Sequence, residues 1–427
     1  MRSYRGARGL LVVAAAMVGG GAGASVARAT PTKLKASTPV KGAVFGDSVA
    51  VSANDSVALV GADSGTAGKA GAAFIFTKNA SGVWSQKKKL VPSDSAAGNV
   101  FGQAVALSSD GTTAVVSAPS ASWGSGADDV GEVYIFSDAS GSWTQIGRIE
   151  SPGTTNSDGT WGEALAISSD ASVIAVGDPN AGTEGQGAAY FYTGSSGSYA
   201  AAGGVTGSQT FANLGSAVAV SGSGNLIAVG QPNAYVSGTG YLPQVYTFTS
   251  SGSSFGYQAD IASPDGTEDD GFGSGALGLN STGTSILVGV PNIGEFEGEY
   301  VTGGAYLLTY ASGSWGSPTL FSTAASGSDE ICALGYSGTL SPNGDAILLG
   351  EPFGNGSGSE GDGAAVEWTE SGGDWSSPTT YPSAGTGTHD DFGLSVALPS
   401  SDYGNPVIGA PDSTVSSLAD AGAAYAY

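Results

Sequence analysis

Short apolar runs of about five residues recur along the whole chain and are separated by turns rich in Gly, Ser, Asp and Asn. In one stretch, residues 104–108, 113–117, 132–136 and 143–149 predict four β-strands. Asp110-Gly111 and Ser140-Gly141 predict tight hairpin turns inside that group. Because no helical period follows the N-terminal segment, the pattern predicts an all-β chain of four-stranded antiparallel units.

These units repeat seven times. An aromatic residue or Leu followed by Gly recurs at steps of 53 to 62 residues, at Phe45, Phe101, Trp161, Leu214, Phe272, Leu334 and Phe392. A second landmark follows 16 or 17 residues later, at Gly61-Ala62-Asp63, Ser117-Ala118-Pro119, Gly177-Asp178-Pro179, Gly230-Gln231-Pro232, Gly289-Val290-Pro291, Gly350-Glu351-Pro352 and Gly409-Ala410-Pro411. Seven four-stranded units predict a seven-bladed β-propeller.

Side-chain size fits that geometry. Small residues such as Ala104 and Ala106 fill the first strand of a unit, which would crowd around the axis. An aromatic residue follows the Ser/Gly turn in six units, at Trp84, Trp143, Tyr199, Phe255, Trp315 and Trp375. We expect these large side chains to form the core between blades.

The two ends of the chain predict how the ring closes. The seventh unit stops at Tyr427, after its third strand. Leu34 lies 11 residues before Phe45, just as Leu90, in a fourth strand, lies 11 residues before Phe101. The segment around Leu34 is therefore a spare fourth strand that should complete the last blade, which leaves no long unpaired sheet edge.

Residues 1–29 have the pattern of a secretory signal peptide. Arg2, Arg5 and Arg8 precede the apolar run 10–18, and Ala27-Arg28-Ala29 forms a small-x-small cleavage site. Nine apolar residues are fewer than the roughly 20 that span a bilayer, although an uncleaved anchor is the alternative. We therefore expect residues 30–427 to form one propeller domain that is secreted, extracellular or at the cell surface.

The net negative charge of the chain limits the kinds of partner that it could bind. The chain has 13 Lys and Arg against 37 Asp and Glu, and no Lys or Arg follows Arg148. Removal of residues 1–29 leaves nine basic residues and a formal charge of −28. Such a surface repels nucleic acid and anionic membranes. Cys332 is the only cysteine, so it forms no internal disulfide and is expected to be a buried thiol.

The paired Phe-Gly and Gly-Ala-Pro landmarks resemble FG-GAP repeats, the units of the integrin α-chain N-terminal propeller, over about residues 33–427. The resemblance is to the secreted bacterial type and implies an adhesion-like binding role. Many such repeats bind Ca²⁺ through Asp-x-Asp-x-Asp-Gly in the turn between strands 1 and 2, but in this chain that turn reads, for example, Ser108-Ser109-Asp110-Gly111. Because Ca²⁺ needs six to eight oxygen ligands, we assign no calcium site to these turns and expect no cofactor, with bound calcium as the alternative.

The long loops after strands 2 and 4 should share one face of the propeller. That face would hold 23 of the 37 acidic residues. This face could recognise a cationic or cation-bridged partner. The simpler alternative is that the acids only keep the exposed loops hydrated. The candidate partner-binding residues are Asp265, Glu268, Asp269, Asp270, Asp329, Glu330, His389, Asp390 and Asp391.

Catalysis has few candidates. His389 is the only histidine, so a Ser-His-Asp triad has one possible base. Glu268, Asp269 and Asp270 could act as a carboxylate pair on a glycan. We predict a non-catalytic, monomeric binding protein for an unknown protein or glycan at the cell surface or outside the cell. An extracellular polysaccharide hydrolase or lyase and a structural surface-layer component are the alternatives.

Ring closure gives the first testable prediction. Deletion of residues 30–40 should strongly lower the melting temperature, because the last blade would lose its outer strand. Thermal unfolding followed by circular dichroism measures this, and an unchanged melting temperature would contradict closure.

Overall fold

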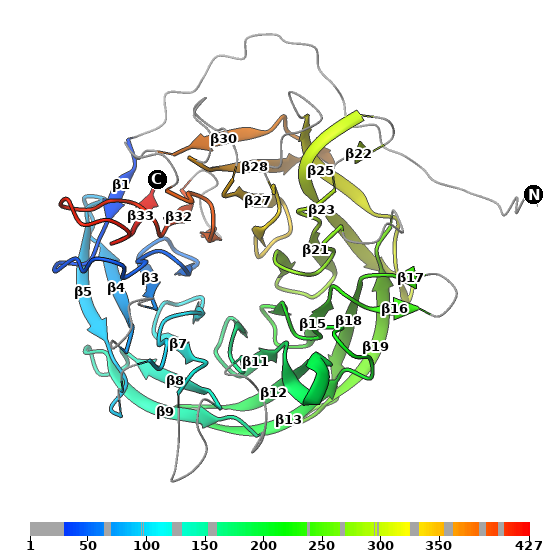
Figure 1. The fold of residues 1–427 in the computed structure, drawn as a ribbon, viewed down its shortest axis with the longest axis horizontal. Coiled ribbons are helices and arrows are strands. Elements are labelled where there is room, and N and C mark those ends of the chain that lie inside the picture. Colours follow the sequence, from blue (N-terminus) through cyan, green and yellow to red (C-terminus); the bar gives the residue numbers. More distant parts are fainter. Residues whose placement is uncertain are drawn as a thin grey trace, which may run out of the picture.

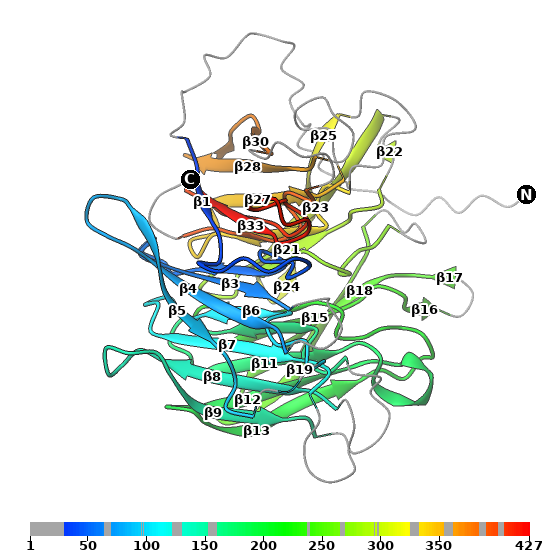
Figure 2. The ribbon, with the colours of Figure 1, turned by 60° about the vertical axis from the view of Figure 1, so that its left-hand side comes forward.

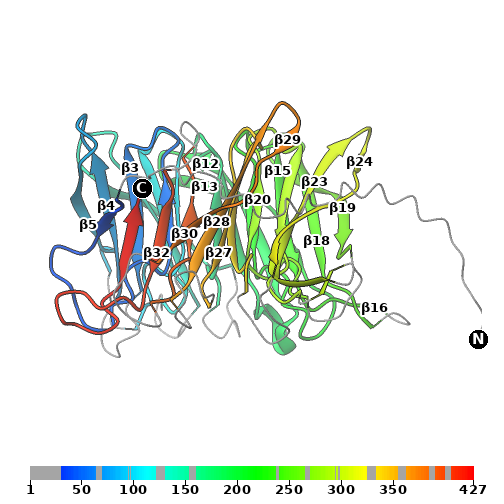
Figure 3. The ribbon, with the colours of Figure 1, turned by 90° about the horizontal axis from the view of Figure 1, so that it is seen from above.

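The computed structural model describes residues 30–427 except 64–69, 95, 97, 122–129, 153–159, 237–239, 265–269, 294, 297–298, 325–332, 354–361, 384–389 and 400–404. It forms a ring of seven antiparallel sheets around a central axis (Figure 1), which confirms the all-β seven-bladed propeller. Viewed from the side, the strands run between two faces (Figure 3). Residues 1–29 and Cys332 lie outside the described residues.

Blades 1 to 4 each have four strands, which follow one another from the axis outward. Blade 1 has β2 (Val49–Val51), β3 (Val57–Ala62), β4 (Ala72–Lys78) and β5 (Trp84–Leu90), and blade 2 has β6 (Val105–Leu107), β7 (Thr113–Ala118), β8 (Glu132–Ser137) and β9 (Thr144–Glu150). Blade 3 has β10 (Ala164–Ile167), β11 (Val173–Asp178), β12 (Ala188–Ser195) and β13 (Ser198–Thr206), and blade 4 has β14 (Val218–Val220), β15 (Leu226–Gln231), β18 (Gln244–Ser250) and β19 (Phe255–Ala262).

Blades 5 and 6 have divided outer strands, and blade 7 uses both ends of the chain. Blade 5 has β20 (Leu277–Leu279), β21 (Ser285–Gly289), β23 (Glu299–Ala311), β24 (Ser314–Trp315) and β25 (Thr319–Ala324), with β22 (Glu295–Phe296) extending it. Blade 6 has β26 (Ser337–Leu340), β27 (Ala346–Glu351), β28 (Ala364–Ser371), β29 (Asp374–Trp375) and β30 (Thr379–Pro382). Blade 7 has β31 (Val396–Ala397), β32 (Val407–Ala410), β33 (Ala423–Ala426) and β1 (Thr32–Leu34).

Two elements lie in loops outside the blades. The strands β16 (Tyr235–Val236) and β17 (Gly240–Tyr241) form a small hairpin in the loop between β15 and β18. Ala181–Gly185 forms a five-residue π-type turn, η1, between β11 and β12. In blade 2, every strand begins and ends within one residue of the predicted position.

The outer strand of blade 7 comes from the N-terminus, as predicted. Thr32 pairs with Ala426 and Leu34 pairs with Ala424, so β1 extends the sheet formed by the last three strands. Figure 2 shows dark-blue β1 beside red β33. Leu34 is buried against blade 1 residues such as Phe74 and Phe76. The first strand therefore closes the ring by both backbone hydrogen bonds and apolar packing.

The two sequence landmarks bind each other in every blade. The backbone N–H of the glycine in each aromatic-Gly pair donates to a carbonyl oxygen of the second landmark, at 2.8 to 3.2 Å. The seven pairs are Gly46 with Gly61, Gly102 with Ser117, Gly162 with Gly177, Gly215 with Gly230, Gly273 with Gly289, Gly335 with Gly350 and Gly393 with Gly409. The residue before each of these glycines is at most 1 % exposed, which confirms its place in the core.

The aromatic residues after the Ser/Gly turns also pack between blades. Trp84 and Trp143 are buried, and Tyr199, Phe255, Trp315 and Trp375 are partly buried against the inter-blade clusters. Each cluster combines side chains of adjacent blades, because the two faces of one sheet pack on different neighbours.

The turns between strands 1 and 2 contain a serine-centred hydrogen-bond network. In six blades a buried Ser or Asn side-chain oxygen accepts the backbone N–H five residues later, at 2.9 to 3.1 Å. Successive turns also bond to one another through backbone groups at 2.7 to 2.9 Å, including Ala53 to Ser109 and Ser109 to Ser169. These bonds link blades 1 to 6 on the face opposite the long loops.

A substitution of Gly102 provides a test of the close backbone contact between blades. The φ of Gly102 is +104°, and a Cβ there would lie 2.4 Å from the carbonyl oxygen of Ala72 in blade 1. Gly102→Ala should therefore cost several kcal/mol, well above the roughly 1–2 kcal/mol for a strained φ alone. Gly82→Ala is the control, because its φ is +78° and nothing lies within 4 Å of the added carbon. Denaturant unfolding compares the two variants, and equal losses would contradict the proposed clash.

Candidate functional site

The long loops after strands 2 and 4 lie together on one face of the ring. The backbone N–H of Asn292 donates to the carbonyl of Asp270 at 3.1 Å, and that of Asp412 donates to the carbonyl of Asp390 at 3.3 Å. Each bond joins a loop after strand 2 to a loop that enters the same blade. The hairpin turns occupy the opposite face (Figure 3).

Three of the nine candidate partner-binding residues lie in the described part of the chain. Asp265, Glu268, Asp269, Asp329, Glu330 and His389 lie outside it. Asp270 is 2 % exposed and accepts hydrogen bonds from the Ser263 hydroxyl and from the Phe272 N–H, the latter at 2.8 Å. Asp390 is 4 % exposed, and Asp391 is partly buried with a φ of +51°.

Three aspartates lie in blades 7 and 1, at those ends of the inner strands that point to the face with the long loops. Asp47 precedes β2, Asp63 follows β3, and Asp412 follows β32. We call Asp47, Asp63 and Asp412 the acidic rim. Burial, together with the nearby carboxylates of Asp63 and Asp412, raises the pKa of Asp47 to about 7. Burial alone raises the pKa of Asp63 to about 6.

An exposed aromatic pair continues this rim into blade 6. Tyr336 and Phe353 are 43 % and 46 % exposed, and their ring centroids lie 5.8 Å apart in a T-shaped arrangement. Tyr336 follows the Leu-Gly pair as Asp47 follows the Phe-Gly pair, and Phe353 follows its Pro as Asp412 does. Burial raises the pKa of Tyr336, and the charges of Asp47 and Asp391 raise it further. The aromatic pair therefore lies within electrostatic reach of the acids.

Blade 3 carries a second acidic pair at equivalent positions. Glu163 follows the Trp-Gly pair, and burial with the nearby charge of Asp178 raises its pKa. Burial raises the pKa of Asp178 to about 6, although the Thr160 hydroxyl donates a hydrogen bond of 2.7 Å to it. Carboxylates with raised pKa values thus occur on both sides of the axis.

Asp47 was missed by sequence reasoning, which looked for acids in long loops. Asp63 and Asp412 were counted among those acids, but nothing in their spacing joined them to Asp47. The signal that could have found the group is the position directly after each aromatic-Gly pair, which is Asp47, Glu163 and Tyr336 in blades 1, 3 and 6.

The axis holds a cavity of about 260 Å³ between the innermost strands. Its described lining is mostly aliphatic, with Val49, Val51, Val105 and Leu107 among its residues, and includes no titratable side chain. The described residues contain no cluster of three or more His, Cys, Asp or Glu that could hold a metal ion. Within the same residues, no helix is long and apolar enough to cross a bilayer.

Asp47 gives a pH-dependent prediction. Its pKa of about 7 exceeds its ordinary value of 3.8, so the folded state holds the proton more tightly than the unfolded state. The stability that Asp47 contributes is therefore complete below about pH 4 and is lost as the pH rises through 7. Asp47→Asn should stabilise the protein at pH 8 by up to about 4 kcal/mol, because one pKa unit is worth about 1.4 kcal/mol.

Melting temperatures at pH 4 and pH 8 measure this effect. The gain should nearly vanish at pH 4, and the exposed Asp374→Asn control should change the melting temperature little at either pH. An equal gain for Asp47→Asn at both pH values would show that the carboxylate is not desolvated.

Comparison with known proteins gives one family match. The FG-GAP repeat family matches residues 84–136, from β5 of blade 1 through β8 of blade 2. No curated protein matches the chain significantly. The match contains both landmarks of blade 2, Phe101-Gly102 and Ser117-Ala118-Pro119, whose backbone groups bond to each other. The chain thus carries an FG-GAP repeat within a seven-bladed β-propeller.

Proposed function

We propose that this protein is a non-catalytic binding protein that acts outside the cell and recognises a cationic group of a surface protein or glycan. FG-GAP propellers have a fold typical of binding proteins. The observation that carries the proposal is the acidic rim, whose Asp47 lies within electrostatic reach of Tyr336 in the exposed Tyr336–Phe353 pair.

Electrostatics favours a cationic ligand at this place. The rim carboxylates are partly desolvated and repel one another, which raises the pKa of Asp47. A bound cation would relieve that repulsion and lower the pKa values, so binding should weaken as the pH falls from 8 to 5. Exposed aromatic faces add cation–π attraction, worth about 0.5–1 kcal/mol at an exposed site.

The two alternatives have less support. The hydrolase or lyase hypothesis depended on Glu268, Asp269 and Asp270, and buried Asp270 accepts two hydrogen bonds within its own loop. No contact among the described residues favours a surface-layer component. Secretion follows from the signal-like residues 1–29 and is part of the proposal.

A matched pair of triple variants tests the proposal. Asp47→Asn, Asp63→Asn and Asp412→Asn together remove the acidic rim, whereas Asp260→Asn, Glu370→Gln and Asp374→Asn remove the same charge elsewhere. Asp270 and Asp390 are left intact, because substitution of these buried acids would disturb the fold. The rim variant should bind a lysine-rich peptide at least about tenfold more weakly, since charge-assisted hydrogen bonds are worth about 1.5–3 kcal/mol.

Isothermal titration calorimetry at constant ionic strength measures the difference, because salt screens exposed charges. Pull-down from the native surface with both variants extends the comparison to the natural partner. Equal binding by the rim variant and its control would reject the acidic rim as the recognition site.

A further inference from the structure

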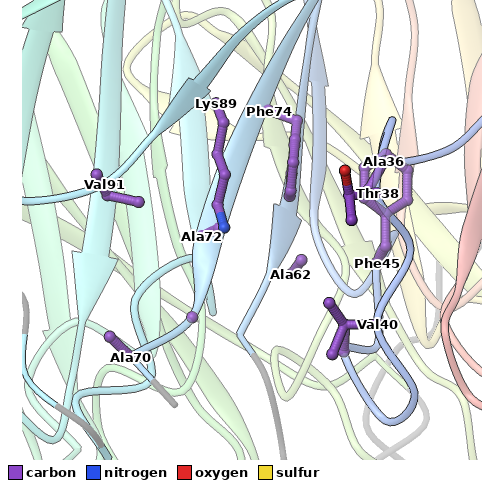
Figure 4. A pocket seen from close by; sticks show the side chains of 12 residues that line it. Ala36, Thr38, Val40, Phe45, Ala62, Ala70, Ala72, Phe74, Lys89 and Val91 are labelled. Carbon is purple, nitrogen blue, oxygen red and sulfur yellow. The ribbon is translucent and has the colours of Figure 1, made fainter.

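A largely apolar cavity of about 290 Å³ lies where the ring closes, between residues 36–45 and the outer part of blade 1 (Figure 4). Its lining includes Thr38 of the closing segment, Ala72 and Phe74 of β4, Lys89 of β5 and Val91 just after β5. Lys89 is the only charged residue in the lining. The cavity is separate from the acidic rim, because none of the rim carboxylates lines it.

Blade 2 provides an internal comparison, because the strand registers of the two blades match. Phe74 pairs with Lys89 across β4 and β5, and Tyr134 pairs with Arg148 across β8 and β9. The equivalent residues of blades 1 and 2 are therefore Ala72 and Glu132, Phe74 and Tyr134, Lys89 and Arg148, and Val91 and Glu150. Thr38 corresponds to Asp94, since each lies four residues after the leucine of an outer strand.

In blade 2 this place is filled by a network of charges. The Arg148 guanidinium lies 2.8 Å from Asp94, 3.2 Å from Glu132 and 2.6 Å from Glu150. The Tyr134 hydroxyl contacts Asp94 at 3.0 Å and also bonds to Glu132. A cation surrounded by carboxylates is thus the arrangement that the repeat can build here.

In blade 1 the cation is kept but its three acidic partners are replaced. Thr38, Ala72 and Val91 stand at the positions of Asp94, Glu132 and Glu150, and Phe74 lacks the tyrosine hydroxyl. Among the described residues no carboxylate pairs with Lys89, whose ammonium lies 5.7 Å from the centroid of the Phe74 ring. The smaller side chains leave the cavity, and Val91 is 47 % exposed beside it.

We propose that this cavity binds a small amphipathic carboxylate. The ligand's carboxylate would pair with Lys89, as Asp94 and the two glutamates pair with Arg148 in blade 2. Its hydrocarbon part would lie against Phe74, Ala72 and Val91. The volume is close to the lower end of about 300–1,000 Å³ for ligand pockets, so a chain of roughly eight carbons is a suitable probe.

Calorimetric titration of the purified full chain with octanoate at pH 7 tests the proposal. Octanoate should bind at least about tenfold more tightly than octanol or octylamine, because only octanoate carries a negative charge that forms an ion pair with the Lys89 ammonium. Lys89→Met should remove this preference. Lys88→Met is the matched control and should retain it, because Lys88 pairs with Ile75, which packs toward blade 2.

A second variant supplies the missing acids from within the chain. Thr38→Asp with Val91→Glu places carboxylates where Asp94 and Glu150 lie in blade 2. This variant should lose octanoate binding while its melting temperature stays equal or rises, which separates loss of the site from loss of the fold. The proposal is overturned by no octanoate binding to the wild type, by equal affinity for octanol, or by equal effects of Lys88→Met and Lys89→Met.

Discussion

The rest of the ring depends on one constraint: at the boundaries between blades, the backbone of one blade packs against the backbone of the next. A Cβ on Gly61 would lie 2.0 Å from the carbonyl oxygen of Gly102 in the next blade, and one on Gly409 would lie 2.0 Å from that of Gly46. Both landmarks of the repeat therefore need glycine for the same reason, since each packs against the other across a blade boundary. Blade 2 is the exception: Ser117 stands at this position, and a Cβ on the facing Gly162 would lie 3.0 Å from the Ser117 Cβ.

This contact also explains how the chain divides into repeats. The matched FG-GAP segment starts in the outer strand of blade 1 and ends in the third strand of blade 2, so the repeat is offset from the blade by one strand. Each repeat therefore contributes strands to two neighbouring blades, which are covalently linked by the chain that runs between them. Blades 7 and 1 receive the same covalent tie from β1, which pairs with β33 and leads directly into Phe45.

The sequence predicted the fold in detail because its signals are local. Asp110-Gly111 and Ser140-Gly141 fix the ends of the blade 2 strands, and the spacing from Leu34 to Phe45 identifies the closing strand. The candidate site depends on distant pairs and on burial, which spacing does not encode. Asp47 and Asp412 become neighbours only when the ring closes, and Asp270 is buried with its carboxylate accepting the N–H of Phe272. Loop acids could therefore be counted from the sequence, but accessible and structural ones could not be separated.

A rigid ring allows one blade to differ from the next without moving the backbone. Packed interiors collapse only partly around a deleted side chain, so the small residues of blade 1 leave a cavity where blade 2 has its charge network. Charge then distinguishes this boundary further. Apart from Arg148, every Lys or Arg beyond the signal-like segment lies in the range from Lys33 to Lys89, within an otherwise acidic chain. The local field should therefore guide small anions toward the closing boundary, whereas cations are attracted to the acidic rim and loops.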